Sequence, residues 1–336
     1  MKTTASDGLF FQWHITDACN FRCRHCYQHD FTHNSELALP ELIKVYENIA
    51  SCAGGRKINL NITGGEPFLR KDLYELLRYL DKHQDTGELM LITNASLIDE
   101  KALDALGGVK KLKAIKISLD GATEKTNDAI RRPGAFRTAL EKVNLIQERA
   151  GLEVIIMLTL MRSNAYEIPA IFNLCRELRV DGLMLERFIP LGQSGALKSE
   201  VITKEDWKRT VKDICEYLEV DLAESEILPC KAFWVKFEGD DARLLTAECN
   251  LGDDAFAIMP NGGLLPCRRF DLVLGNLLKD KFTDIVKRSS VLRDIADKSK
   301  LKGKCRNCQI DRCRGCRAMA YAVDKDYLAE DNLCWL

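Results

Sequence analysis

The string CNFRCRHC occupies residues 19–26 and places Cys19, Cys23 and Cys26 in the spacing C-x3-C-x2-C. An apolar run at residues 9–15 precedes it directly and predicts a strand. Three thiolates this close together suit three irons of a four-iron cluster, which normally takes four cysteine ligands. The next cysteine is Cys52, so the fourth iron would have no thiolate. An open metal position is typical of a catalytic site rather than a structural one.

A structural zinc site is the alternative, because C-x2-C alone is a common zinc element. His25, His29 and His33 lie nearby and supply nitrogen ligands that zinc also accepts. The spacing of this one motif therefore leaves both metals open.

Strand patterns alternate with helix patterns from residue 9 to about residue 218. The strand patterns fall at residues 9–15, 57–63, 88–93, 112–118, 153–160 and 182–188. The helix patterns carry apolar stripes, such as Leu42, Val45, Tyr46 and Ile49. Six β-α units predict an α/β fold with a parallel sheet. Right-handed crossovers then place every loop that follows a strand at one edge, where α/β active sites lie.

Glycine and polar residues follow each of these strands. They are Gly64, Gly65, Glu66 and Pro67 after the second strand, Thr93 and Asn94 after the third, Ser118 and Asp120 after the fourth, Asn164 after the fifth and Arg187 in the sixth. Paired glycines let a backbone approach a ligand closely, and a carboxylate such as Glu66 accepts hydrogen bonds from an ammonium group. An ordinary glycine turn and helix caps are the alternative. With the three cysteines after the first strand, the recurrence in all six loops favours a ligand site.

Composition describes an ordinary globular protein of 336 residues, with 46% hydrophobic residues, 29% charged residues and a net charge of −1. This charge indicates no attraction to nucleic acid or to anionic membranes. The beginning of the sequence lacks a signal-peptide pattern, and the longest apolar stretch, residues 154–161, is too short to cross a bilayer. We therefore expect a cytoplasmic protein without a membrane partner.

Cysteine is the outlying residue type, with 14 copies. Seven of them lie late in the chain: Cys249, Cys267, Cys305, Cys308, Cys313, Cys316 and Cys334. Clustered cysteines in a chain without a secretion signal indicate metal binding in a reducing compartment. A pair of zinc knuckles is one interpretation of C-x2-C…C-x2-C at residues 305–316. The change of pattern places a domain boundary near residue 220.

Together, the cysteine triplet, the motif GGEP at residues 64–67 and the late cysteines resemble the radical S-adenosylmethionine (SAM) superfamily with a C-terminal SPASM extension. The resemblance implies a partial (β/α)6 barrel over residues 1–220 and a small Cys-rich α+β SPASM domain over residues 221–336. It also implies that Cys19, Cys23 and Cys26 hold a 4Fe–4S cluster whose open iron binds SAM. An electron from that cluster would cleave SAM, and the resulting 5′-deoxyadenosyl radical would take a hydrogen atom from a substrate.

The resemblance assigns further roles to the loop residues and the late cysteines. The SAM contacts would be Gly64, Gly65, Glu66, Pro67, Thr93, Asn94, Ser118, Asp120 and Asn164, with Arg187 on the SAM carboxylate. One auxiliary 4Fe–4S cluster would use Cys305, Cys308, Cys313 and Cys334, and the other Cys249, Cys267 and Cys316. Cys230 is the candidate for the fourth ligand of the second cluster, and an iron without a protein ligand is the alternative. The family's central run is commonly longer by one residue in each of its two later gaps, and the family often has TNG where this chain has Thr93-Asn94-Ala95.

The leading prediction for the reaction is oxidative crosslinking of a ribosomally made peptide. Decarboxylation of a tetrapyrrole side chain, maturation of a sulfatase and a non-catalytic iron–sulfur or zinc scaffold are the alternatives. The expected partners are the peptide or small-molecule substrate and a reductant such as ferredoxin or flavodoxin. Because the first strand begins by residue 9, we also expect a separate protein to bind any leader peptide.

Overall fold

Six strands form where the sequence predicts them, and helices cover one face of the sheet that they build. The structure is a computed structural model that describes residues 8–239 and 241–336; residues 1–7 of the first predicted domain lie outside the described residues. The strands are β1 (Gly8–His14), β2 (Lys57–Thr63), β3 (Thr86–Thr93), β4 (Leu112–Ser118), β5 (Glu153–Leu160) and β6 (Gly182–Arg187). The bounds of β2, β4 and β5 are those predicted, and β3 begins slightly earlier.

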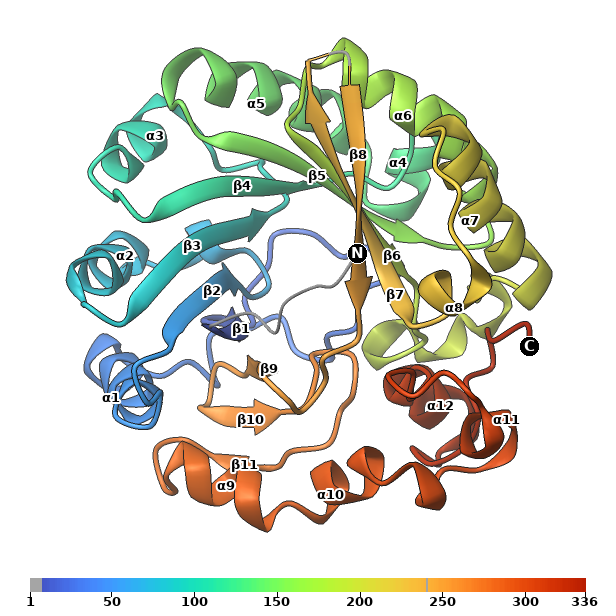
Figure 1. The fold of residues 1–336 in the computed structure, drawn as a ribbon. Helices are drawn as coiled ribbons and strands as arrows, with labels where there is room; N and C mark the ends of the chain where they lie inside the picture. The colour runs from blue at the N-terminus through green and yellow to red at the C-terminus, as the bar shows by residue number, and fades with distance from the viewer. Residues whose placement is uncertain (1–7, 240) are drawn as a thin grey trace.

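Helices connect these parallel strands and pack against the outside of the sheet (Figure 1). They are α1 (Leu39–Ala50), α2 (Leu73–Lys82), α3 (Glu100–Leu106), α4 (Glu124–Ile130), α5 (Ala135–Arg149), α6 (Ile168–Glu177) and α7 (Lys204–Tyr217). In α1 the predicted stripe of Leu42, Val45, Tyr46 and Ile49 is fully buried. Burial of such stripes, rather than helix propensity, supplies most of the stability of short helices.

The strands beyond residue 220 join the same sheet at its two edges, which the sequence patterns do not predict. These strands are β7 (Cys230–Glu238), β8 (Asp241–Glu248), β9 (Ala255–Ile258), β10 (Gly263–Leu265) and β11 (Gly275–Asn276). The sheet order is β11-β10-β9-β1-β2-β3-β4-β5-β6-β7-β8. The β7–β8 hairpin is antiparallel to β6, and β9 is parallel to β1. The fold is therefore a partial (β/α)6 barrel whose C-terminal extension continues both edges.

Short helices complete the Cys-rich segment, and the last two of them lie near the C-terminus (Figure 1). They are α8 (Glu224–Ile227), α9 (Phe282–Arg288), α10 (Ser290–Ala296), α11 (Gly303–Asn307) and α12 (Arg317–Asp324). None of the helices in the described ranges is long and apolar enough to cross a membrane.

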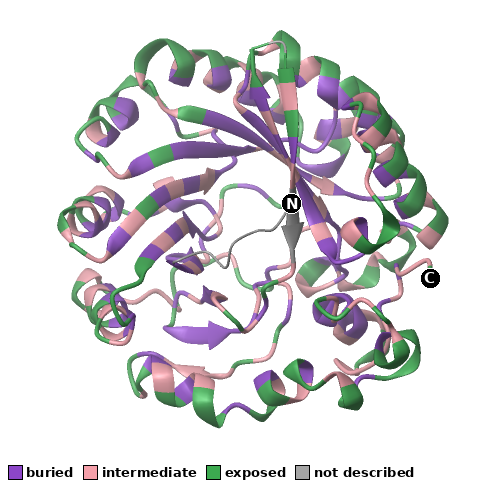
Figure 2. Ribbon diagram, in the orientation of Figure 1, coloured by how far each residue is buried: buried purple, intermediate pink, exposed green. Residues whose placement is uncertain are grey.

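The two faces of the sheet differ in burial, and this difference positions the site. In β2 the residues Ile58, Leu60 and Ile62 face the helices and are fully buried, whereas Asn59 and Asn61 alternate with them and are only half-buried. The same banding of buried and intermediate residues runs along the neighbouring strands (Figure 2). The hydrophobic core therefore lies between sheet and helices, and the residues on the inner face of the barrel are less deeply buried.

Candidate active site

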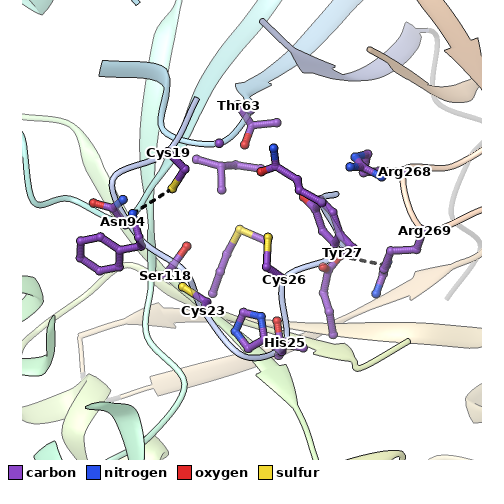
Figure 3. A pocket seen from close by; sticks show the side chains of 18 of the residues that line it. Cys19, Cys23, His25, Cys26, Tyr27, Thr63, Asn94, Ser118, Arg268 and Arg269 are labelled. Atoms are coloured by element: carbon purple, nitrogen blue, oxygen red, sulfur yellow. Dashed lines mark hydrogen bonds and ion pairs between the residues drawn. The ribbon is translucent and has the colours of Figure 1, made fainter. Parts of the chain in front are cut away.

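A cavity lies at the carboxyl ends of the parallel strands, where the right-handed crossovers place the loops. Cys19, Cys23 and Cys26 enter it from the loop after β1, with Arg268 and Arg269 from the loop after β10 on another side (Figure 3). Gly64, Gly65, Thr93, Asn94, Ser118 and Arg187 also line it. The predicted residues that do not line it are Glu66, Pro67, Asp120 and Asn164.

Backbone hydrogen bonds hold the cysteine loop in place. Within the loop, Cys26 N donates to Cys23 O at 3.0 Å. Arg24 N donates to Ile130 O at 2.8 Å, which fixes the loop to the end of α4. On the opposite side, Gln193 Nε2 donates to Cys23 O at 2.6 Å. The loop is therefore anchored by both of its neighbours before any ligand binds.

The chemistry of the three thiols suits an iron–sulfur cluster. All three cysteines are free and line the same cavity. Burial raises the pKa of Cys19 to about 11 and that of Cys23 to about 12. Only thiolates bind metal, so iron must displace the protons when these groups become ligands. The guanidinium of Arg131, with Nη1 3.9 Å from Cys23 Sγ, favours that ionisation.

The two glycines of the second loop pack against the segment between β1 and the cysteines. Gly65 N donates to Thr16 O at 2.9 Å, and Glu66 N donates to Ala18 O at 2.8 Å. A Cβ atom at Gly64 would collide with Thr16 O, and one at Gly65 would collide with Ala18 O. The absence of side chains therefore serves the contact between the first two loops, and both glycines still line the cavity.

The carboxylate of Glu66 is fully buried behind the cavity wall. It accepts hydrogen bonds from Asn94 N and from Thr93 Oγ1, both at 2.8 Å. Burial raises the pKa of Glu66 to about 7. Pro67 follows it as the first residue of a short 3-10 helix, Pro67–Leu69. Glu66 thus joins the loop after β2 to the end of β3, and its role as a SAM contact stays a prediction.

Asp120 and Asn164 also lie behind the wall, where they organise the loops after β4 and β5. Asp120 is fully buried; its Oδ2 lies 2.5 Å from Nε2 of His25 and 2.7 Å from Nε of Arg131. Asn164 Nδ2 donates to Asp120 O and to Thr159 O, both at 2.9 Å. The structure brings these residues near the cysteine loop, and direct SAM contact by either stays a prediction.

Arginines supply most of the charge around the cavity. Arg131, Arg187, Arg268 and Arg269 line it, with Glu186 as the one acidic lining residue in the described part of the chain. Arg131 pairs with Asp120, Arg187 with Asp331 and Arg269 with Glu186. Arg268 is buried over the ring of Tyr27, 4.1 Å from its centroid. Among the residues that the structure describes, no carboxylate forms an ion pair with Arg268.

The sequence marks some of these arginines as part of a site and not others. Arg268 and Arg269 directly follow Cys267, so the sequence predicts that they lie close to a cysteine group. Arg131 follows α4, and nothing in the spacing of its neighbours marks it as part of a site.

The late cysteines form two groups, although their spacing is short. Cys305, Cys308, Cys313 and Cys334 line a second cavity. Cations accompany them: Arg317 Nη2 lies 3.5 Å from Cys305 Sγ, and Lys231 Nζ lies 3.9 Å from Cys313 Sγ. Positive charge next to a thiolate offsets its charge and tunes a cluster.

Cys249, Cys267 and Cys316 form the other group. Burial, with neighbouring Cys316, raises the pKa of Cys249 to about 11, and burial also raises the pKa of Cys267. Cys230, the proposed fourth ligand, begins β7, and its thiol donates to Glu226 O at 3.3 Å. The grouping agrees with the one that the resemblance implies, and the role of each cysteine as a ligand stays a prediction.

In the described ranges, no three His, Cys, Asp or Glu side chains are placed to hold one metal ion. The ligands of a four-iron cluster bind several irons of one cluster rather than a single ion.

One buried carboxylate connects both cysteine groups to the first cavity. Asp331 Oδ2 accepts from Cys316 N at 2.8 Å, and Asp331 N donates to Cys305 Sγ at 3.4 Å. The same carboxylate lies 3.7 Å from Arg187 Nη2 and 3.5 Å from Lys231 Nζ. Arg187, predicted to hold the SAM carboxylate, is therefore already paired with an internal carboxylate.

Comparison with known proteins gives matches to two families. Residues 13–175 match the Radical SAM superfamily, and residues 249–309 match SPASM, described as an iron–sulfur cluster-binding domain. The AdoMet-dependent heme synthase of Methanosarcina barkeri is 29% identical over 96% of this chain and 95% of that protein. The mycofactocin maturase MftC of Mycobacterium tuberculosis is 26% identical over 90% of this chain and 76% of that protein.

Solved structures share the fold. Streptococcus suis SuiB bound to its precursor peptide SuiA superposes with a TM-score of 0.73 at 17% identity. The match covers 98% of this chain and 76% of SuiB. At this identity the likeness concerns the fold alone.

Proposed function

The chain is a radical SAM enzyme with a C-terminal SPASM domain that uses SAM and 4Fe–4S clusters, and we propose that it decarboxylates the propionate side chains of a tetrapyrrole. Arg268 lines the cavity without an ion-pair partner among the described residues, and this observation carries the proposal. A buried guanidinium without an anionic partner is costly, and a carboxylate is the group whose geometry it matches best.

Relatives support the same substrate class. The heme synthase of Methanosarcina barkeri aligns along nearly its whole length with this chain. Heme synthases from two further organisms align over 96–99% of this chain at 26% identity. A product named heme and a cavity with excess arginine both point to a porphyrin that carries carboxylates.

The proposed conversion balances in atoms and charge. When bound, SAM and the N-terminal cluster supply a 5′-deoxyadenosyl group that takes one hydrogen atom from an unactivated carbon. A propionate that loses this hydrogen atom, carbon dioxide and one electron becomes a vinyl group. The electron carries away the negative charge of the carboxylate and would pass to an oxidised auxiliary 4Fe–4S cluster, while the carboxyl group leaves as neutral carbon dioxide.

The protein's own residues would bind and orient the substrate. Arg268 would hold the reacting carboxylate, and its stacking on Tyr27 keeps the guanidinium plane fixed. Arg269 is tethered by Glu186, with Nη2 3.2 Å from Oε1, so it can offer only its remaining donors. The cysteine loop and the arginines line the same cavity. A carboxylate arm held by the arginines would therefore lie beside the bound cofactor.

The test uses anaerobically reconstituted protein with iron coproporphyrin III, SAM and dithionite. We expect 5′-deoxyadenosine together with a porphyrin that has lost carbon dioxide and two hydrogens per propionate. A variant with Cys19, Cys23 and Cys26 replaced by alanine should form neither product, and Cys215→Ala on α7 is the matched control. If 5′-deoxyadenosine forms while the porphyrin is unchanged, the radical chemistry stands and the substrate class is wrong.

A peptide substrate is the second candidate. MftC and the sporulation killing factor maturation protein SkfB of Bacillus subtilis, both maturation proteins, align over 90% and 88% of this chain. Their identities, 26% and 25%, are lower than the 29% of the first heme synthase. A mass loss of two hydrogens on a co-expressed precursor peptide, without loss of carbon dioxide from porphyrin, would favour this candidate.

A further inference from the structure

The inside of the barrel is not filled below the first cavity. Met90 on β3 and Met184 on β6 alternate with fully buried residues and are themselves only half-buried, as is Met157 on β5, which also lines the first cavity. Small barrels usually fill their interior with side chains or hold a ligand there. Flexible methionines that remain partly accessible inside a barrel are suited to a bulky apolar guest.

A lower cavity of about 600 Å³ continues this space toward the amino ends of the strands. Met90, Ile155, Trp234 and Lys236 are among the residues that line it, and the β7–β8 hairpin forms one wall. Its volume lies within the range of roughly 300–1,000 Å³ that is typical of small-molecule pockets. Nothing in the function proposed above uses this cavity.

Lys116 lies between the two cavities on β4. Ser118, two residues further along the same face, lines the first cavity. Lys116 Nζ donates to Asn61 Oδ1 at 2.9 Å and lies 5.8 Å from the ring centroid of Trp234, which lines the lower cavity. The lysine is 4% exposed. Its ammonium therefore occupies the centre of the barrel rather than the surface.

This ammonium lacks the partners that a buried charge normally has. It has three donors, and the structure gives it one acceptor, the neutral amide of Asn61. No carboxylate in the described residues forms an ion pair with it. Glu186 interacts with Lys116 electrostatically without forming an ion pair with it. Glu186 is itself paired with Arg269. Burial lowers the pKa of Lys116 to about 8, so most molecules carry the charge at neutral pH.

We propose that Lys116, with Trp234 beside it, forms a carboxylate-binding subsite that holds a second acidic arm of the substrate. The inference rests on the proposed function, because it assigns a place to carboxylates that Arg268 does not bind. The aromatic ring of the substrate would pack against Trp234 and the methionines. The flexible stem of the lysine lets the ammonium turn from Asn61 toward the ligand.

Isothermal titration calorimetry of the reconstituted holoenzyme tests this subsite with two probes, coproporphyrin III and benzene-1,3,5-tricarboxylate. Lys116→Met should weaken the binding of both by about tenfold or more, the usual effect of losing a charged hydrogen bond. Lys125→Met, an exposed lysine of α4, is the matched control and should bind both as the wild type does. Because Lys116 has no ion-pair partner among the described residues, Lys116→Met leaves no buried carboxylate uncompensated.

A second variant separates the charge from the shape of the site. Asn61→Asp gives Lys116 an internal carboxylate partner and should weaken both probes, although the lysine is still present. If coproporphyrin III binds the wild type, Lys116→Met and Asn61→Asp equally well, the subsite is wrong and the tetrapyrrole proposal stands. If the wild type binds only the tricarboxylate and loses it in Lys116→Met, the subsite stands and the tetrapyrrole proposal is wrong. Binding of neither probe overturns the subsite.

Discussion

Arg187 Nη2 and Asp331 Oδ2 lie 3.7 Å apart, and both side chains are buried. Arg187 ends β6 and lines the first cavity, whereas Asp331 belongs to the C-terminal segment that contacts Cys305 and Cys316. The pair therefore links the first cavity to both late cysteine groups. A displacement of Asp331 would therefore disturb the first cavity and both late cysteine groups together.

Asp331→Asn should lower the free energy of unfolding by about 3–5 kcal/mol, because it leaves Arg187 and Lys231 buried without their carboxylate. Denaturant unfolding of the reconstituted protein measures this change. Asp326→Asn is the matched control, since it breaks only an exposed pair with Lys302 and should cost less than about 1 kcal/mol. Equal losses of unfolding free energy in the two variants would show that the buried pairs of Asp331 stabilise the protein no more than an exposed pair does.

Gly65→Ala should be destabilising, because the added Cβ would collide with Ala18 O and push the second loop away from the cysteine loop. We expect a loss of about 1–3 kcal/mol, as for other overpacked sites, and less iron retained at the N-terminal site. Gly108→Ala offers a control, since a Cβ there meets no atom within 4 Å. Iron per chain and the unfolding free energy are the measurements. A neutral Gly65→Ala variant would mean that the glycine is not needed for this contact.

The sequence predicts the strands well because each parallel strand leaves a local apolar pattern. Glu66 and Asp120 are different, since residue type and loop place them at the correct edge but do not say which way their side chains turn. Both side chains point into the protein rather than into the cavity: Glu66 accepts a hydrogen bond from Asn94 N, and Asp120 pairs with Arg131. The pairing of β9 with β1 joins segments far apart in the chain, and no local pattern encodes it.

Ala95 shows how a departure from a family pattern is accommodated. It stands where the family often has glycine after Thr93-Asn94, and its φ is +63°, a left-handed conformation that favours glycine. Ala95 N donates to Thr93 Oγ1 at 2.9 Å, and the residue is fully buried. The backbone turn of the motif is thus kept without its glycine, which the sequence alone does not reveal.

The pH dependence of stability should report on Glu66. Burial raises its pKa to about 7 in the folded protein, against 4.5 for an unperturbed glutamate. Between these values the folded chain keeps a proton that the unfolded chain has lost, so stability falls as pH rises from about 4.5 to 7. The difference amounts to about 3 kcal/mol for a fully buried group. Glu66→Gln cannot ionise and should lack this part of the dependence.

Unfolding free energies of the wild type and Glu66→Gln at pH 5 and pH 8 measure this effect. The wild type should lose more stability between the two pH values than the variant does. Parallel losses would show that Glu66 ionises in the folded protein as it does in the unfolded chain. Glu75→Gln, in the first turn of α2, controls for the loss of a carboxylate elsewhere.

Iron, sulfide and zinc per chain should reveal how the cysteines are divided. After anaerobic reconstitution we expect about twelve irons, from about four in each of three clusters. Replacing Cys19, Cys23 and Cys26 with alanine should leave about eight, and so should replacing Cys305 and Cys334, which line the second cavity.

The iron losses of the two sets of replacements are independent only if the cysteine groups are separate. The two groups line different cavities, which agrees with this condition. Combining them should therefore leave about four irons, held by the group of Cys249, Cys267 and Cys316. About four irons in the wild type, none in the N-terminal variant and zinc in both would instead mean that the late cysteines build a zinc domain. The charges of Arg317 and Lys231 beside Cys305 and Cys313 would then have no cluster to tune.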